Sequence, residues 1–103
     1  MILHINDQEQ FNEAIKEGKV FVDFFATWCG PCQMLAPVLE DMDRNGEFGD
    51  IKVIKVDVDE APEIAGAFNI QSIPTLLLFQ DGKVIDSRLG FMPKPMLLKF
   101  LGK

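Results

Sequence analysis

The sequence is poor in cysteine and histidine, with two cysteines and one histidine among 103 residues. Two cysteines are too few for a small protein held together by a framework of disulfides, so a hydrophobic core must stabilise the chain. Hydrophobic residues make up 48% of the sequence, which is enough for such a core. The length predicts one small domain spanning residues 1–103.

Basic residues are scarce as well. Ten Lys and Arg residues against sixteen Asp and Glu residues give a net charge of −6. Nucleic-acid binding needs a clustered basic footprint, and an anionic membrane surface attracts basic segments, so we expect neither partner. We interpret the acidity as a contribution to solubility.

Long apolar runs and targeting signals are also absent from the sequence. No run approaches the ~18 apolar residues of a membrane-spanning helix. Residues 1–6 contain no Lys or Arg, whereas a secretory signal begins with a segment rich in these residues. Repeats, linkers and low-complexity tracts are missing too. We therefore expect a cytoplasmic, reducing location and, by default, a monomer.

What the sequence does contain is an alternation of strand and helix patterns. Strands are predicted at 2–5, 20–26, 51–58, 75–79 and 84–89, and helices between 7 and 18, at 31–44, from 62 onward for a short stretch, and at 93–101. The order β-α-β-α-β-α-β-β-α begins with βαβ crossovers and ends with a hairpin and a helix. It predicts an α/β fold with a mixed central sheet of about five strands and helices on both faces.

Single residues sharpen these boundaries. Asp7 and Gln10 have the spacing of a capping box at the start of the first helix. The run 20–26 is apolar except for Asp23, as expected of a central strand that is covered on both faces. Pro37 should kink the second helix, because its ring displaces one backbone hydrogen bond. Asp81-Gly82 is typical of a two-residue hairpin turn.

Cys29 and Cys32 are three residues apart at the start of the predicted helix 31–44. Residues at this spacing share one face of a helix, so the two sulfur atoms can meet. A disulfide there closes a very short loop and restricts the unfolded chain by only about 2 kcal/mol. Such a bond contributes little to the stability of a fold and is better suited to being made and broken.

The predicted helix also activates the pair. Unpaired backbone N–H groups and the helix dipole stabilise an anion at a helix N-terminus by about 0.3 to 2 kcal/mol. The thiolate is the nucleophilic form of cysteine, so Cys29 is the candidate nucleophile. Three other interpretations remain open from the residues alone: half of a zinc site, an iron–sulfur cluster shared by two chains, and two inert cysteines. The single histidine, His4, leaves a closed zinc site short of its four ligands.

Trp28-Cys29-Gly30-Pro31-Cys32 resembles the active-site pentapeptide of the thioredoxin family. The resemblance extends over essentially the whole chain, through Val22-Asp23-Phe24, Ala36-Pro37, Lys55-Val56-Asp57, Ile73-Pro74-Thr75, Asp81-Gly82 and Gly90. It implies the thioredoxin fold and a protein dithiol–disulfide oxidoreductase that reduces disulfides in client proteins. It also implies a thioredoxin reductase as the partner that re-reduces the cysteines. A member of the family needs no cofactor or metal of its own, since any flavin, nicotinamide or iron–sulfur group belongs to the reductase.

The resemblance assigns roles around the cysteines. Cys32 becomes the resolving thiol, and Asp23 a buried acid that exchanges a proton with Cys32 through water, although a hydrogen-bonded or partly exposed aspartate is the alternative from the sequence alone. A base near Cys32 is chemically reasonable, because Cys32 must become a thiolate to resolve a mixed disulfide. Lys55 lies on the next strand and becomes the charge partner of Asp23, although an exposed strand lysine is the alternative from the sequence alone. Gly30 and Pro31 tune the redox balance of the pair.

The resemblance also implies a cis peptide bond at Ile73-Pro74 beside the cysteines, leaving the Ile73 backbone free to pair with a client strand. An apolar client-binding surface is then expected around Cys29, formed by Trp28, Pro31, Ile73, Pro74, Leu89, Gly90 and Phe91. We call these seven residues the docking patch. Taken singly, each is more often a core residue than an interface residue.

Several residues depart from the family pattern. Phe25 and Phe91 stand where many thioredoxins have other residues, and Gln33 replaces a basic residue that commonly follows the second cysteine. These differences concern partner choice and not the type of reaction.

Two alternative functions remain: a same-fold oxidase or isomerase, in which the dipeptide between the cysteines usually differs from Gly30-Pro31, and a redox-independent binding module with the same fold.

Overall fold

The computed structural model describes residues 1–103 as nine elements in the predicted order. The strands are β1 (Ile2–His4), β2 (Lys19–Phe25), β3 (Lys52–Asp57), β4 (Thr75–Gln80) and β5 (Lys83–Leu89). The helices are α1 (Gln8–Ala14), α2 (Gly30–Arg44), α3 (Pro62–Ala67) and α4 (Lys94–Phe100). Every predicted element is therefore present, with boundaries that coincide with the prediction or differ from it by one residue, except that α1 already ends at Ala14.

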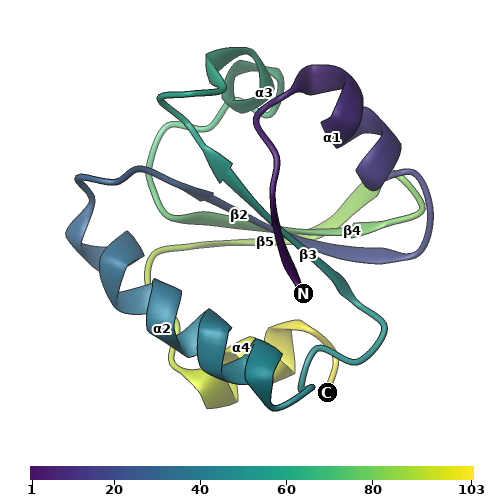
Figure 1. Cartoon of the computed structure of the whole chain (residues 1–103), viewed down its shortest axis with the longest axis vertical. Coiled ribbons are helices and arrows are strands. Elements are labelled where there is room, and N and C mark those ends of the chain that lie inside the picture. The colour runs from purple at the N-terminus through teal and green to yellow at the C-terminus, as the bar shows by residue number, and fades with distance from the viewer.

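The strands form one sheet in the order β1-β3-β2-β4-β5. β2 is the central strand, as its apolar sequence predicts. It runs parallel to β3 but antiparallel to β4, so the sheet is mixed. The helices α1 and α3 cover one face, and α2 and α4 cover the other (Figure 1). The predicted mixed sheet with helices on both faces is confirmed.

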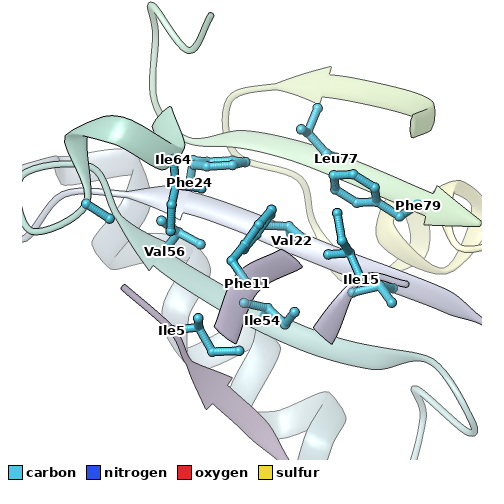
Figure 2. Packing of buried hydrophobic residues seen from close by; sticks show 12 residues of the cluster. Ile5, Phe11, Ile15, Val22, Phe24, Ile54, Val56, Ile64, Leu77 and Phe79 are labelled. Atoms are coloured by element: carbon cyan, nitrogen blue, oxygen red, sulfur yellow. The ribbon is translucent and has the colours of Figure 1, made fainter. Parts of the chain in front are cut away.

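Two hydrophobic cores lie on the two faces of the sheet, because successive side chains of a strand point to opposite sides. Val22 and Phe24 of β2 pack with Phe11 of α1 on one face (Figure 2). Phe21 packs on the other face, beneath α2 and α4. Asp23 has the same parity as Phe21, so the sheet directs its carboxylate toward α2.

The turns and caps follow the local chemistry of their residues. Asp7 accepts a hydrogen bond from the backbone N–H of Gln10 at 2.9 Å and so caps α1. Asp81 and Gly82 both have positive φ, of 50° and 86°, which a tight turn between right-twisted strands requires. The Asp81 carboxylate also accepts a bond from the Gly18 N–H at 2.8 Å. This contact joins the turn before β5 to the turn before β2.

Candidate active site

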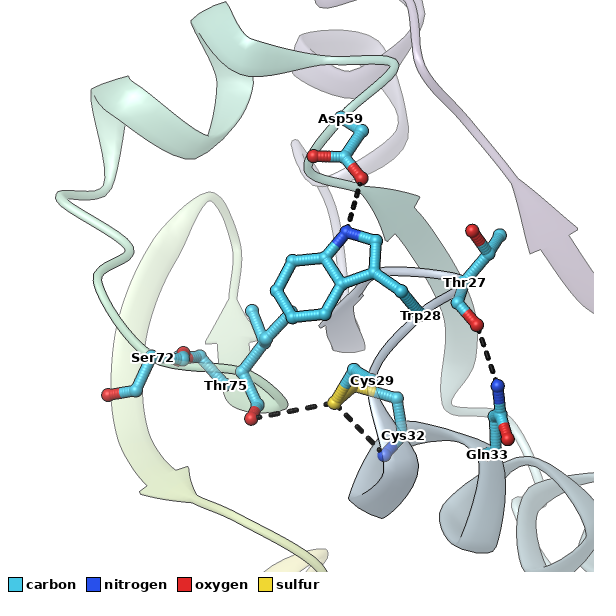
Figure 3. The surroundings of a disulfide bond; sticks show 9 residues. Thr27, Trp28, Cys29, Cys32, Gln33, Asp59, Ser72 and Thr75 are labelled. Carbon is cyan, nitrogen blue, oxygen red and sulfur yellow. Dashed lines mark hydrogen bonds between the residues drawn. A yellow bond between two sulfur atoms is a disulfide. The ribbon is translucent and has the colours of Figure 1, made fainter.

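The cysteine pair lies where the central strand passes into α2. Cys29 is the N-cap residue of α2, and Cys32 is in its first turn. The two residues are joined by a disulfide with a Cα–Cα distance of 5.3 Å (Figure 3). Both side chains are almost fully buried. The predicted juxtaposition of the two sulfur atoms at a helix N-terminus is therefore present.

The Sγ atom of Cys29 occupies the place that a capping oxygen takes in most helices. The backbone N–H of Cys32 donates to it at 3.3 Å (Figure 3). The carbonyl oxygen of Ile73 lies 3.7 Å away. Pro31 lies in the first turn, where its fixed φ favours a helix start and its missing N–H costs nothing. In the reduced state the same N–H and the dipole of α2 would stabilise a thiolate on Cys29.

Asp23 is fully buried on the strand that leads to the cysteines. Neither of its carboxylate oxygens has a hydrogen-bond partner in the protein. Burial raises the pKa of Asp23 to about 6, against a weaker lowering by the positive charge of Lys55. A buried carboxyl group without a partner is costly for a fold. A group with such a shifted pKa, on the strand that leads to the redox pair, is a candidate for proton transfer.

Lys55 lies directly opposite Asp23 in the register of β2 and β3. It is largely buried, and its ammonium group lies 4.5 Å from the centre of the Phe25 ring. Because the Asp23 oxygens have no hydrogen-bond partner, the two side chains form no direct ion pair. The cation acts on Asp23 from a distance and is stabilised by the aromatic ring.

A hollow of about 190 Å³ gives this buried region contact with the surface. It is lined by Phe25, Ala26, Thr27, Cys32, Gln33, Ala36 and Lys55. Cys32 and Lys55 therefore border the same space, which is large enough for several waters. At its rim the Gln33 side chain donates to the Thr27 carbonyl at 2.7 Å (Figure 3). From the sequence alone, Gln33 is only a departure from the family pattern, and no sequence pattern predicts this hollow.

The docking patch is mostly exposed around the cysteines. Trp28 and Leu89 are 70% and 67% exposed, and Phe91 is 37% exposed. Pro31 is exposed too, Ile73 and Gly90 are half-buried, and Pro74 is buried. The sequence grouped Pro74 with the contact residues, but its burial leaves the backbone and side chain of Ile73 as the accessible part of that loop.

Two further contacts shape the patch. The Trp28 indole N–H donates to the Asp59 carboxylate at 2.8 Å (Figure 3). The Gly90 N–H donates to the Pro74 carbonyl at 2.8 Å, bringing the segment after β5 to the Ile73-Pro74 loop. The Ile73-Pro74 bond is cis, as the resemblance implied. The sequence did not reveal the role of Asp59, because nothing in an isolated aspartate marks a partner 31 positions away.

Other kinds of site are not formed. No group of three or more His, Cys, Asp or Glu side chains is arranged to hold a metal ion. None of the helices combines the length and apolar character that crossing a membrane requires.

Comparison with known proteins places this geometry in a family. The family model described as Thioredoxin matches residues 2–103. The thioredoxin of Bacillus subtilis is 48% identical over 103 residues, covering 99% of this chain and 96% of that protein. The thioredoxin of Listeria monocytogenes is 46% identical over 104 residues, covering 100% of this chain and 98% of that protein.

Solved structures agree with the sequence comparisons. The crystal structure of Malassezia sympodialis thioredoxin superposes with a TM-score of 0.90 at 34% identity, covering 98% of this chain and 90% of that one. A structure of Plasmodium falciparum thioredoxin gives 0.88 at 35% identity, covering 97% and 96%. The likeness therefore extends over the full sheet and all the helices.

The raised pKa of Asp23 predicts a pH-dependent stability. An unfolded Asp ionises near pH 3.8 and the folded one near 6, so the folded state binds more protons between these values and stability falls as the pH rises through them. A shift of this size corresponds to about 3 kcal/mol. Asp23→Ala should therefore gain about 3 kcal/mol more over the wild type at pH 8 than at pH 3.5.

Urea unfolding at the two pH values measures this difference. Asp50→Ala, which removes an exposed carboxylate from a loop, is the matched control and should change stability little at either pH. An equal effect of Asp23→Ala at both pH values would show that Asp23 ionises normally in the folded protein.

Proposed function

The chain belongs to the thioredoxin family and is a protein dithiol–disulfide oxidoreductase, and we propose that Cys29 is its nucleophile and Cys32 its resolving thiol. The observation that carries this assignment is the position of the Cys29 Sγ atom. It caps α2, accepts the Cys32 N–H, and lies beside the exposed Trp28 and the half-exposed Ile73. Cys32 lies one turn further into the helix, next to the hollow that adjoins Lys55.

The proposed reaction consists of two thiol–disulfide exchanges. The Cys29 thiolate attacks one sulfur of a client disulfide, forms a mixed disulfide, and releases the other client sulfur as a thiolate that takes up a proton. The Cys32 thiolate then attacks the Sγ of Cys29 and releases the second client thiol. The client gains two electrons and two protons, and the cysteines become the disulfide seen here.

We further propose that Asp23 accepts the proton of Cys32. A pKa near 6 leaves Asp23 largely ionised at neutral pH, yet close enough to this pH to exchange a proton readily. The hollow that Cys32 shares with Lys55 offers a route for water between the thiol and the surface. Lys55 would stabilise the ionised form of Asp23 as its charge partner, since the two residues are opposite one another in the sheet.

The docking patch is proposed to bind the client around its disulfide. Its exposed members are apolar, and the Ile73 backbone lies beside the Cys29 sulfur. An extended client segment could pair with that backbone while its cystine sulfur reaches Cys29. Gly30 and Pro31 are proposed to tune the redox balance, because they are the only residues between the cysteines and form the first turn of α2.

Family membership supports the remaining assignments. Disulfide-containing proteins are the proposed clients, and a thioredoxin reductase is the proposed source of electrons. The redox-active disulfide is the only redox group that the mechanism uses, and no cofactor is required. We also propose that residues 1–103 form a single domain that acts as a monomer in the cytoplasm, without binding nucleic acid or membranes.

Trapping the intermediate tests the assignment of the two cysteines. Cys32→Ser retains the proposed nucleophile but cannot resolve the mixed disulfide, so a covalent adduct with a reducible client such as insulin should accumulate. Cys29→Ser should form little adduct under the same conditions. Intact-protein mass spectrometry after acid quenching measures both. Equal trapping by the two variants would contradict the assignment.

The role of Asp23 is tested by the rate of the second exchange. In single-turnover experiments, Asp23→Ala should slow resolution of the mixed disulfide about tenfold to a hundredfold at pH 7, because a base next to Cys32 is lost. The rise of the wild-type rate with pH near 6 should disappear. Asp50→Ala serves again as the control. A rate that Asp23→Ala leaves unchanged between pH 6 and 8 would overturn the proton-acceptor role.

A further inference from the structure

The charges of this acidic protein are strongly segregated along the chain. Residues 82–103 contain five of its ten basic residues and only one of its sixteen acidic residues, for a net charge of +4. The first 81 residues contain five basic and fifteen acidic residues and carry −10. The basic segment comprises β5 and α4. One part of the fold is therefore positive on a molecule that is otherwise strongly negative.

A hollow of about 280 Å³ lies between β5 and α4 in this basic segment. It is lined by Asp86, Arg88, Met92, Met96, Lys99 and Phe100. We call it the β5–α4 hollow. Half of its lining is apolar and the other half is charged, with two cations and one anion. Its volume exceeds that of a leucine or phenylalanine side chain, so it can take an apolar side chain and leave room at the rim.

Arg88 is held in place at this hollow. Its guanidinium donates to the Asp86 carboxylate at 2.6 Å and to the Ser87 carbonyl at 2.8 Å, and it lies 5.4 Å from the centre of the Phe100 ring. These contacts leave part of a five-donor guanidinium free. An Arg fixed in this way loses less side-chain entropy on binding an anion than a mobile one does.

Lys99 supplies a second cation that nothing in the chain neutralises. It makes no ion pair, whereas Lys94, on the same helix, is bound to Glu47 at 2.6 Å. Met96 is 55% exposed beside it. Methionine side chains adapt their shape to different partners. The β5–α4 hollow thus combines a cation held in place, Arg88, a cation without an ion pair, Lys99, and apolar side chains that can adapt to a ligand.

The β5–α4 hollow lies next to the docking patch along the chain, although the side chains of Arg88 and Leu89 point to opposite faces of the edge strand β5. Arg88 immediately precedes Leu89 in β5, and Met92 immediately follows Phe91. From Arg88 to Gly90 is about 7 Å along an extended chain, and Gly90 is bonded to the Ile73-Pro74 loop beside Cys29. A client segment of roughly five extended residues could therefore reach from Cys29 to Arg88.

We propose that the β5–α4 hollow is a second docking site for clients, which binds an acidic segment carrying an apolar side chain about five residues from the reactive cysteine. This inference rests on the proposed function, because it extends the client-binding surface of the same reaction. The client carboxylates pair with Arg88 and Lys99, and its apolar side chain rests on Met92, Met96 and Phe100. Basic client segments are repelled by Arg88 and Lys99 and attracted to residues 1–81, whose net charge is −10. The β5–α4 hollow therefore selects the orientation in which a client brings its acidic segment to the hollow.

The test uses three short linear peptides, each with one cysteine as a mixed disulfide with mercaptoethanol. They share a leucine and differ only in the two residues beside it, about five positions from the cysteine: Glu-Glu, Gln-Gln or Lys-Lys. The second-order rate constant of reduction by the fully reduced wild-type protein is measured at low salt. We expect the Glu-Glu peptide to react about threefold to tenfold faster than the Gln-Gln peptide, and the Lys-Lys peptide to be slowest. The preference should shrink in 0.5 M salt, roughly three times the ionic strength at which the Debye length is ~8 Å.

Two double variants with the same net charge distinguish the effect of the β5–α4 hollow from the effect of the charge of the whole molecule. Arg88→Gln with Lys99→Gln removes both cations of the hollow and should bring the ratio of the Glu-Glu to the Gln-Gln rate close to one. Lys83→Gln with Lys103→Gln removes two cations of the same segment outside the hollow and should leave most of the ratio intact. Circular dichroism confirms that both remain folded, and the salt dependence of the wild type is an independent measurement that needs no variant.

The possible failures are distinguishable. If the wild type reduces all three peptides at the same rate, the second docking site is wrong while the proposed function stands. If both double variants lower the ratio equally, the preference comes from the general charge of the molecule, and the hollow is again not the site. If the wild type reduces none of the peptides, the proposed function itself fails.

Discussion

The constraint on which the rest of this structure depends is the burial of a carboxyl group without a partner, that of Asp23, on the central strand that leads to the Cys29–Cys32 disulfide. Asp23 weakens the fold at neutral pH, since its ionised form has lost its contact with water and gained no hydrogen bond. The fold tolerates this because both faces of the sheet bury large apolar clusters around it. The arrangement puts a carboxyl group with a pKa near 6 on the strand that leads to the two cysteines.

The topology explains why these groups meet. The central strand β2 supplies Asp23 and then leads directly into the N-cap of α2, so the acid and the cysteines are fixed by one continuous segment. β3 places Lys55 opposite Asp23 on one side, and β4 begins with the Ile73-Pro74 loop on the other. The site is thus made of loops and the first turn of a helix, held by three paired strands that give it a rigid backbone.

The order and type of elements could be predicted from local patterns, because apolar periodicity, the Asp7 cap and the Asp81-Gly82 turn are all short-range signals. The burial of Asp23 was also predictable, since it interrupts a run that is apolar on both faces. Long-range contacts were not. Four features depend on how distant segments pack. They are the hydrogen bond from Trp28 to Asp59, the Gln33 contact with Thr27, the burial of Pro74 and the β5–α4 hollow. The side-chain direction of Lys55 also could not be predicted. The strand register indicates correctly that Lys55 lies opposite Asp23, but its ammonium group contacts the Phe25 ring and forms no ion pair with Asp23.

The most direct test of the account is reduction of insulin disulfides with dithiothreitol as the electron source, followed as turbidity from the precipitating B chain. The wild type is expected to accelerate precipitation strongly, and the double variant Cys29→Ser with Cys32→Ser is expected to add nothing to the dithiothreitol background. A folded wild type that fails to accelerate the reaction, or a double variant that matches it, would contradict the claim that this cysteine pair is the working centre of the protein.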